Sequence, residues 1–148
     1  MGVNRFEDLR VWQAAKQQCD QVWALLQRPA LRSDPGLVDQ LSRASTSVVF
    51  NVTEGFLRRR DKETMQFLRY AMASNGELKA AYYVAEGRAC LSAGEMPERI
   101  NLNESIAKML NRWYAILEAR DPRNVARGRN QARTKDQGRT TGQGRTKH

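Results

Sequence analysis

The sequence predicts an all-α protein: an antiparallel, up-down-up-down four-helix bundle with a disordered basic C-terminal tail. In four long segments apolar residues recur every three or four positions, which is the period of an amphipathic helix. The connections between these segments are short, and short connections favour antiparallel neighbours in a bundle. From residue 123 onward apolar residues become rare, so this part of the chain is predicted to contribute nothing to a core.

The first helix is predicted over residues 7–28. Its inner face is marked by Leu9, Trp12, Ala15, Cys19, Val22, Trp23 and Leu26. Pro29 ends this pattern, and a turn cluster at residues 33–36 leads into the second helix, which is predicted over residues 37–57. The inner face of the second helix carries Leu41, Ala44, Val48, Val52 and Gly55.

The third and longest helix is predicted over residues 62–92, with Asp61 as its N-cap and Gly94 in the left-handed conformation after its end. Many inner positions of this helix are small, which favours close packing against a neighbouring helix. The whole inner face comprises Phe67, Leu68, Ala71, Ser74, Leu78, Ala81, Ala85 and Ala89, and its alanines and serine are the small positions. The fourth helix is predicted over residues 97–120, and residues 121–122 end it. Its inner face carries Ile100, Ile106, Met109, Leu110, Trp113, Ile116 and Leu117.

Charge divides the chain into two parts. The sequence has 25 Lys and Arg against 16 Asp and Glu, a formal net charge of +9. Residues 1–120 carry 17 basic and 14 acidic side chains, a net of +3, whereas residues 121–148 carry 8 and 2, a net of +6. The predicted domain organisation is therefore a four-helix bundle over residues 1–120 and a disordered, Arg/Gly/Gln/Thr-rich basic tail over residues 121–148.

The composition argues against membrane and secreted proteins. The sequence has no run of about 18–20 apolar residues, which a membrane-spanning helix requires, and its N-terminus lacks the pattern of a secretory signal. Cys19 and Cys90 are too few and too far apart for a disulfide scaffold or a CxxC metal site, and we expect them to be buried free thiols. The expected location is the cytoplasm.

Catalytic and metal-binding patterns are equally scarce. The only histidine, His148, ends the chain, which argues against a Ser-His-Asp or Cys-His catalytic arrangement. Glu54 and Glu77 are possible inward-facing carboxylates, but without an interior histidine we interpret them as partners of arginines or backbone groups. We expect no enzymatic activity, no cofactor and no metal.

The densest basic run of the bundle lies at residues 58–62, between the second and third predicted helices. Arginine matches phosphate oxygens bidentately, so this run is a candidate phosphate-contacting surface. The alternative is a solvated loop whose cations suit the C-terminal end of the second helix. Together with the basic tail, the run favours nucleic-acid binding. The candidate nucleic-acid-binding residues are Arg58, Arg59, Arg60, Lys62, Arg69, Arg123, Arg127, Arg129, Arg133, Lys135, Arg139, Arg145 and Lys147.

Aromatic and β-branched residues indicate both a core and a subunit interface. Trp12, Trp23 and Trp113 lie on apolar stripes and are predicted to be core residues. Tyr82 and Tyr83 point about 100° apart on a helix, so one of them lies off the core face, where tyrosine suits an interface. The second helix also has more apolar positions than one stripe needs, which favours homo-oligomerisation.

Residues 6–15, FEDLRVWQAA, resemble the opening of the first helix in the small four-helix-bundle proteins encoded in ribosomal-RNA intervening sequences. Residues 39–56 resemble their second helix, and several positions between 62 and 85 fit their third. The resemblance covers about residues 5–117 and leaves out the basic tail.

This resemblance implies an antiparallel four-helix bundle that assembles into a ring-like homopentamer and has no enzymatic activity. The same fold family includes the Avd accessory proteins of diversity-generating retroelements, which implies a basic surface for nucleic acid and for a reverse transcriptase. We therefore expect a non-enzymatic homopentameric scaffold that binds nucleic acid, RNA foremost, through its basic surface and tail. The alternative is a protein-interaction adaptor, such as a reverse-transcriptase accessory subunit.

Overall fold

The structure, a computed structural model, describes residues 2–140. This part of the chain contains no strand and five α-helices, which confirms the predicted all-α class: α1 (Arg10–Leu26), α2 (Pro35–Leu57), α3 (Asp61–Gly87), α4 (Met96–Ala119) and α5 (Pro122–Thr140). Short 3-10 helices at Phe6–Asp8, Pro29–Leu31 and Ala93–Glu95 precede α1, follow it and precede α4. Helices α1 to α4 correspond to the four predicted segments.

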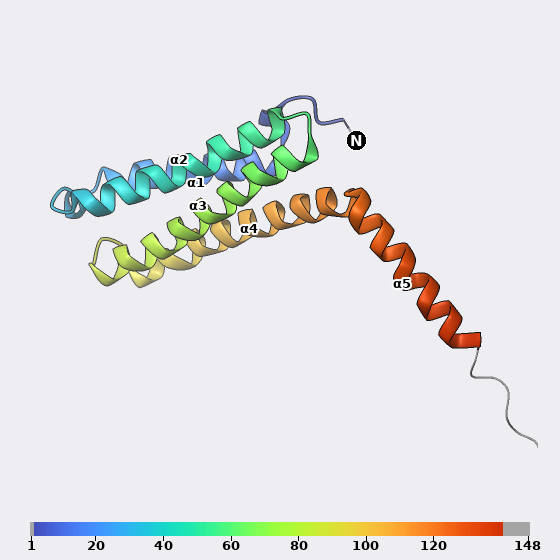
Figure 1. Cartoon of the computed structure of the whole chain (residues 1–148). Coiled ribbons are helices and arrows are strands. Elements are labelled where there is room, and N and C mark those ends of the chain that lie inside the picture. The colour runs from blue at the N-terminus through green and yellow to red at the C-terminus, as the bar shows by residue number, and fades with distance from the viewer. Residues whose placement is uncertain (1, 141–148) are drawn as a thin grey trace, which may run out of the picture.

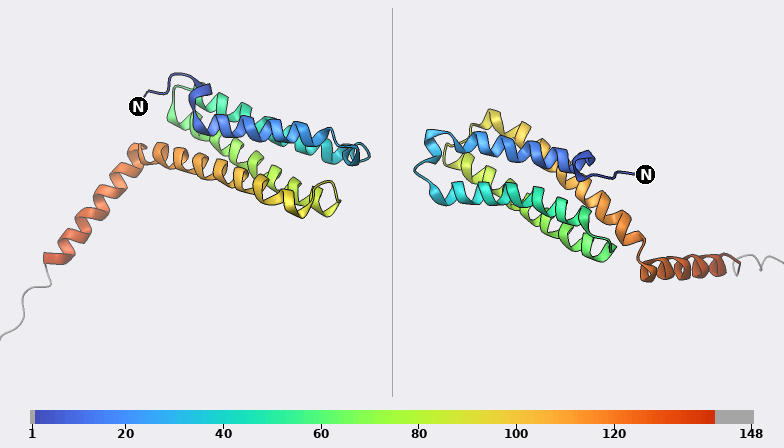
Figure 2. Two further views of the ribbon diagram at one scale, coloured as in Figure 1. Left: turned by 180° about the vertical axis from the view of Figure 1, so that it is seen from behind. Right: turned by 90° about the horizontal axis from the view of Figure 1, so that it is seen from above.

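Helices α1 to α4 pack alongside one another (Figure 1). The largest contact is between α2 and α3; α1 flanks α2, α4 flanks α3, and α1 also touches α4. The α1–α2 and α3–α4 connections lie at one end of this assembly. The α2–α3 connection, the N-terminus and the α4–α5 junction lie at the other, which we call the tail end. From the tail end α5 extends away from the other helices, as Figure 2 also shows.

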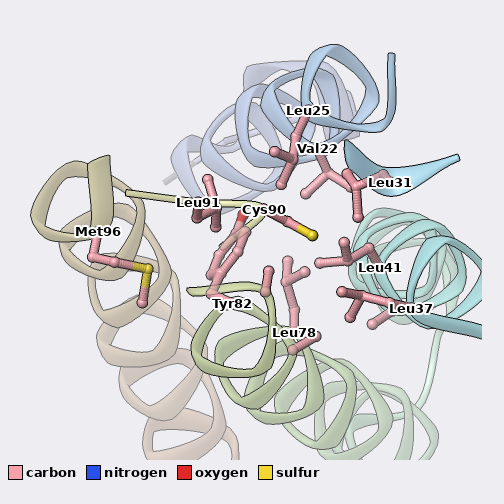
Figure 3. Packing of buried hydrophobic residues seen from close by; sticks show 13 residues of the cluster. Val22, Leu25, Leu31, Leu37, Leu41, Leu78, Tyr82, Cys90, Leu91 and Met96 are labelled. Atoms are coloured by element: carbon pink, nitrogen blue, oxygen red, sulfur yellow. The ribbon is translucent and has the colours of Figure 1, made fainter. Parts of the chain in front are cut away.

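The interior holds two clusters of buried apolar side chains, one toward each end of the bundle. Figure 3 shows the cluster nearer the α1–α2 connection, in which Tyr82 of α3 is fully buried. Its neighbours in this cluster include Leu25, Leu41, Leu78 and Met96, so all four helices contribute. The second cluster also draws on all four helices, through Val11, Ala15, Val48, Val52, Leu68, Ala71, Ile106 and Leu110.

A layer of buried amide side chains separates these two clusters. It consists of Gln18 of α1, Asn75 of α3 and Asn103 of α4, which are 0%, 2% and 1% exposed. Gln18 Nε2 donates to Asn75 Oδ1 at 3.1 Å, and Asn103 Nδ2 donates to Gln18 Oε1 at 3.0 Å. Asn75 Nδ2 donates to the Asn103 carbonyl oxygen at 3.0 Å, which closes the ring of contacts. The layer was not predicted from the sequence, because an isolated amide in an apolar stripe gives no local signal of its partners.

The ends of α3 differ from the prediction. The backbone of Arg60 takes the N-cap position without a side-chain cap, and Asp61 is the first helical residue, where its charge suits the helix dipole. At the other end α3 stops at Gly87, five residues before the predicted 92. Ala89, not Gly94, adopts the left-handed conformation, with φ of 57°. The predicted N-cap and the predicted glycine stop are therefore wrong.

Hydrogen bonds explain why α3 ends early. The Cys90 amide donates to the Ala85 carbonyl at 2.8 Å, and the Ala89 amide donates to the Glu86 carbonyl at 2.9 Å. These are the two bonds of a Schellman motif, which places Ala89 at the position that favours glycine. Burial of Cys90 and Leu91 against the first cluster outweighs the backbone strain at Ala89.

Substituting Ala89 with glycine is expected to raise the free energy of unfolding by about 1 kcal/mol, because glycine adopts a positive φ without steric strain. Urea denaturation measures this change. The matched control is Ala80→Gly in the exposed interior of α3, which is expected to lower the free energy of unfolding by about 1 kcal/mol. Destabilisation by both substitutions would contradict the assignment of Ala89.

An ion pair joins the α3–α4 connection to the α1–α2 connection. Arg28 pairs with Glu95 through both carboxylate oxygens, and it also donates to the Cys90 carbonyl at 3.3 Å. Glu95 in turn accepts from the Ser92 amide at 2.8 Å in a capping box. The Arg28 side chain, followed by the Ser92 amide, lowers the pKa of Glu95 to about 2 from its ordinary 4.5.

The low pKa of Glu95 predicts a pH dependence of stability. The contribution of its ionised form is complete above about pH 4.5 and is lost as the pH falls toward about 2, since the folded state favours the carboxylate. Glu95→Gln is therefore expected to remove part of the loss of stability between neutral and acidic pH, measured as urea midpoints at pH 7 and at pH 3. Glu86→Gln, on the exposed surface of α3, serves as the control. Equal pH profiles for Glu95→Gln and the unaltered protein would show that the pair contributes nothing.

The C-terminal segment also differs from the prediction. Where the composition predicts disorder, residues 122–140 form α5. Asp121 accepts a hydrogen bond from the Arg123 amide at 2.9 Å, and Pro122 occupies the first helical position, both of which favour helix initiation. Alanine, arginine, glutamine and lysine then propagate the helix. The composition correctly indicated a lack of packing, since residues 122–137 are exposed. Residues 141–148 of the predicted tail lie outside the described residues.

Candidate nucleic-acid interface

The predicted basic run lies at the tail end, in the turn between α2 and α3. Thr64 in the first turn of α3 donates its hydroxyl to the Gly55 carbonyl at 2.9 Å and so ties the two helices together. A Cβ on Gly55 would lie 3.4 Å from Phe67 Cβ, which shows how closely α2 and α3 approach. Only residues 58–60 span this connection, and their side chains are exposed.

A hollow of about 420 Å³ opens beside this turn, where the start of α3 meets the α4–α5 junction. Leu117, which is buried, and Met65, which is partly buried, form its inner wall together with Pro122. Four exposed basic side chains surround its mouth: Arg59, Arg60, Lys62 and Arg120. We call this feature the tail-end hollow. It joins the predicted basic run to the beginning of α5.

Asp121 holds Arg123 at the edge of the tail-end hollow. Its carboxylate accepts from Arg123 Nη2 at 2.8 Å and from Arg123 Nε at 3.2 Å. The Arg123 side chain and backbone amide lower the pKa of Asp121 to about 2, and the charge of Lys62 adds a smaller effect in the same direction. Asp121 is thus ionised at neutral pH, and its ion pair with Arg123 offsets the charge of both side chains beside the four cations that line the hollow.

Two predicted site residues instead make contacts within the bundle. Arg58 pairs with Glu54 at 2.7 Å and lies over the Phe67 ring, 4.7 Å from its centroid. Arg69 donates to Gln66 at 2.7 Å and to the Tyr114 hydroxyl at 2.9 Å. Neither residue lines the tail-end hollow. Conversely, Arg120 lines the hollow but is not among the predicted site residues, although its position at the end of a predicted helix next to the basic tail was a usable signal.

Helix α5 carries the predicted cations of the tail away from the bundle (Figure 1). Arg127, Arg129, Arg133 and Lys135 are all exposed. At 100° per residue Arg129 and Arg133 share one side of the helix, whereas Arg127 and Lys135 lie on other sides, so α5 presents positive charge in several directions. Arg139 belongs to α5, but its side chain, together with Arg145 and Lys147, lies outside the described residues.

A larger groove at the opposite end of the bundle suits nucleic acid less well. It has a volume of about 570 Å³ and lies between α2 and α3. Its acidic side chains, Asp34 and Glu77, outnumber its one basic side chain, Arg88. Arg88 also donates to Asp34 at 2.6 Å, and this ion pair offsets the positive charge of Arg88. Charge therefore favours the tail-end hollow, despite its smaller volume.

The carboxylates and cysteines do not form a metal site in the described residues. No group of three or more His, Cys, Asp or Glu side chains within residues 2–140 is placed to hold a metal ion. Glu54 is exposed and pairs with Arg58, as interpreted from the sequence, and Glu77 accepts from Gln40. Among the described helices, none has the length and apolar character needed to cross a membrane.

Several large apolar side chains remain exposed on the bundle. Trp23 is 66% exposed, so its predicted core position is wrong: it lies just outside the face of α1 that packs on the other helices. Tyr82 is buried and Tyr83 is 53% exposed, which confirms that the two point to different sides. Phe50 and Leu57, 66% and 61% exposed, are seven residues apart and share a face of α2. These side chains offer apolar surface outside the core.

Comparison with known protein families shows which family this chain belongs to. The family model described as 23S rRNA-intervening sequence protein matches residues 7–112. The chain belongs to this family. No curated protein and no solved structure matches the chain.

The tail-end hollow lies across the boundary of the match to the 23S rRNA-intervening sequence protein family. Arg59, Arg60 and Lys62 lie within the matched residues, whereas Arg120 and the whole of α5 lie beyond them. The matched residues therefore cover α1 to α3 and most of α4, and the basic helix α5 lies beyond them.

Proposed function

We propose that this protein is a non-enzymatic, homopentameric scaffold in the cytoplasm, whose antiparallel, up-down-up-down bundle binds nucleic acid, specifically RNA. The observation that carries the proposal is the concentration of positive charge at one end. Four basic side chains line the tail-end hollow, and residues 122–140 add a helix with six basic residues and one acidic residue. Such a surface attracts the phosphate backbone and releases its counterions.

The placement of charge on α5 supports binding without sequence discrimination. Arg123 and Arg127 are four residues apart, as are Arg129 and Arg133, and like charges at this spacing repel each other on a helix. Phosphates that approach from several sides relieve this repulsion. Because α5 has no single basic face, we expect contacts to the backbone of RNA and not to base edges in one groove.

Self-association adds to this function through avidity. The exposed Phe50, Leu57 and Tyr83 supply apolar area that a second copy of the chain can cover. A pentamer brings five basic tails together, and linked sites of this kind raise affinity by about 10²–10⁴ over a single tail. Light scattering tests this step: a mass near five times 16.9 kDa supports the pentamer, and a monomeric mass contradicts it.

Binding of a single-stranded RNA to the full chain, measured by fluorescence anisotropy across a salt series, tests the proposed function. We expect log K to fall steeply and linearly with log salt concentration. The second candidate function is a protein-interaction adaptor, such as a reverse-transcriptase accessory subunit, and it is favoured by the exposed Trp23 and Phe50. If the full chain binds no RNA at low salt, the adaptor becomes the better explanation.

A further inference from the structure

The tail-end hollow combines three kinds of lining. The inner wall is apolar (Met65 and Leu117), and the mouth is cationic (including Lys62 and Arg120). The third kind is a carboxylate. Of the two acidic residues, Asp121 is occupied by Arg123, whereas no hydrogen bond or ion pair of the Asp61 side chain occurs within residues 2–140. A bare phosphate would use the cations but neither of the other two features.

From this lining we infer that the tail-end hollow binds one unpaired nucleotide of an RNA strand, an inference that rests on the proposed RNA binding and gives it a site. The base lies against the apolar wall, the phosphates contact the cations, and Asp61 accepts a hydrogen bond from a ribose hydroxyl. Proteins that recognise single-stranded RNA commonly stack splayed bases on aromatic rings or Arg guanidinium planes, and Arg59, Arg60 and Arg120 line this hollow beside its apolar wall.

The size of the hollow supports a single nucleotide. Its volume, about 420 Å³, lies near the lower end of the roughly 300–1,000 Å³ typical of small-ligand sites. A duplex is too wide to enter a hollow of this volume and keeps its bases stacked inside. The RNA strand can also continue beyond the hollow along α5. This helix begins at Pro122 in the lining and offers Arg127 and Arg129 to the phosphates of the next nucleotides.

Paired variants of the full chain test this inference with two RNA probes, a single strand and a blunt-ended duplex of the same length. Met65→Gln removes apolar character from the inner wall without changing charge. Met72→Gln is its matched control, since Met72 is also partly buried on α3 against the same cluster but does not line the hollow. Arg120→Gln removes a cation at the mouth, and Arg112→Gln removes an exposed one from the same helix away from the hollow.

Met65→Gln is expected to weaken single-strand binding about tenfold and duplex binding less than about twofold, because only an unpaired base contacts the inner wall. Arg120→Gln is expected to weaken single-strand binding about tenfold, the usual effect of one lost charge-assisted contact. Both control variants are expected to stay within about twofold of the unaltered chain. Thermal unfolding verifies that the variants are folded. If Met65→Gln is unfolded, the comparison of Arg120→Gln with its control Arg112→Gln decides the test, since both arginines are exposed.

Failure of the inference and failure of the proposed function give different results. Equal effects of each variant and its control, with strong salt-dependent RNA binding by the unaltered chain, overturn the nucleotide site and leave RNA binding intact. Absence of RNA binding by the unaltered chain overturns both. Adenosine 5′-monophosphate, followed by NMR, provides a separate arm. Amide shifts at Lys62, Met65 and Arg120 that occur without any RNA binding would identify a site for a free nucleotide, which also overturns the inference.

Discussion

Truncation of the chain after Arg120 is expected to lower the salt dependence of RNA binding sharply. The removed residues 121–148 carry eight basic and two acidic side chains, a net charge of +6. Each neutralised phosphate of a single strand contributes about −0.7 to the slope of log K against log salt concentration, so loss of six charges makes the slope shallower by about 4 units. At low salt the affinity is expected to fall by about 10² or more. Fluorescence anisotropy with a labelled single-stranded RNA measures both quantities.

A full-length charge variant separates the charge of α5 from its presence. Glutamine at Arg127, Arg129, Arg133 and Lys135 keeps a good helix former at each position and removes four charges. The slope is then expected to be about 3 units shallower than that of the unaltered chain. If the truncated chain retains the affinity and slope of the full chain, α5 has no part in RNA binding and the basic turn between α2 and α3 must account for it.

Replacing Asn75 with leucine is expected to lower the free energy of unfolding by about 3 kcal/mol, because it leaves the buried Gln18 Nε2 and Asn103 Oδ1 without partners and removes one of the acceptors of Asn103 Nδ2. Gln18 Nε2 donates to Asn75 Oδ1, and Asn103 Nδ2 donates to the same oxygen at 3.0 Å. All three residues are at most 2% exposed, so water does not readily replace the lost contacts. Urea denaturation with linear extrapolation measures the change.

Two further variants identify the cause of this loss. Asn111→Leu, on the exposed surface of α4, removes one amide contact to the Ala107 carbonyl and is expected to change stability by less than about 0.5 kcal/mol. Leucine at Gln18, Asn75 and Asn103 together removes every member of the layer. This triple variant is expected to be more stable than Asn75→Leu, since an apolar layer leaves no orphaned polar group. If Asn75→Leu is as stable as the unaltered protein, the amide layer contributes nothing to the free energy of unfolding.

The amide layer bears on function through the arrangement of the helices. A closed ring of hydrogen bonds from α1, α3 and α4 is satisfied in one longitudinal alignment of these helices, whereas purely apolar side chains tolerate small shifts. The alignment of α3 with α4 also sets which residues meet at the tail end. The layer therefore helps to place Lys62 at the start of α3 beside Arg120 at the end of α4.

The sequence by itself determined the helical segments and the electrostatic character of the protein. Apolar periodicity and turn residues are local properties, so α2 is predicted to within two residues at its start and to the residue at its end. The position of the basic run followed from the same boundaries. The errors arose where longer-range contacts decide the backbone: burial of Cys90 and Leu91 ends α3 early, and Ala89 takes the conformation expected of Gly94.

Only the tertiary structure decided which side chains meet. Gln18 lies 57 residues from Asn75 and 85 from Asn103 in the sequence, yet all three form one layer. Arg120 joins the basic run only because α3 and α4 lie side by side and place their tail-end residues around one hollow. Such contacts depend on the rotation and alignment of whole helices, which the packing of all four helices sets and no short stretch of sequence specifies.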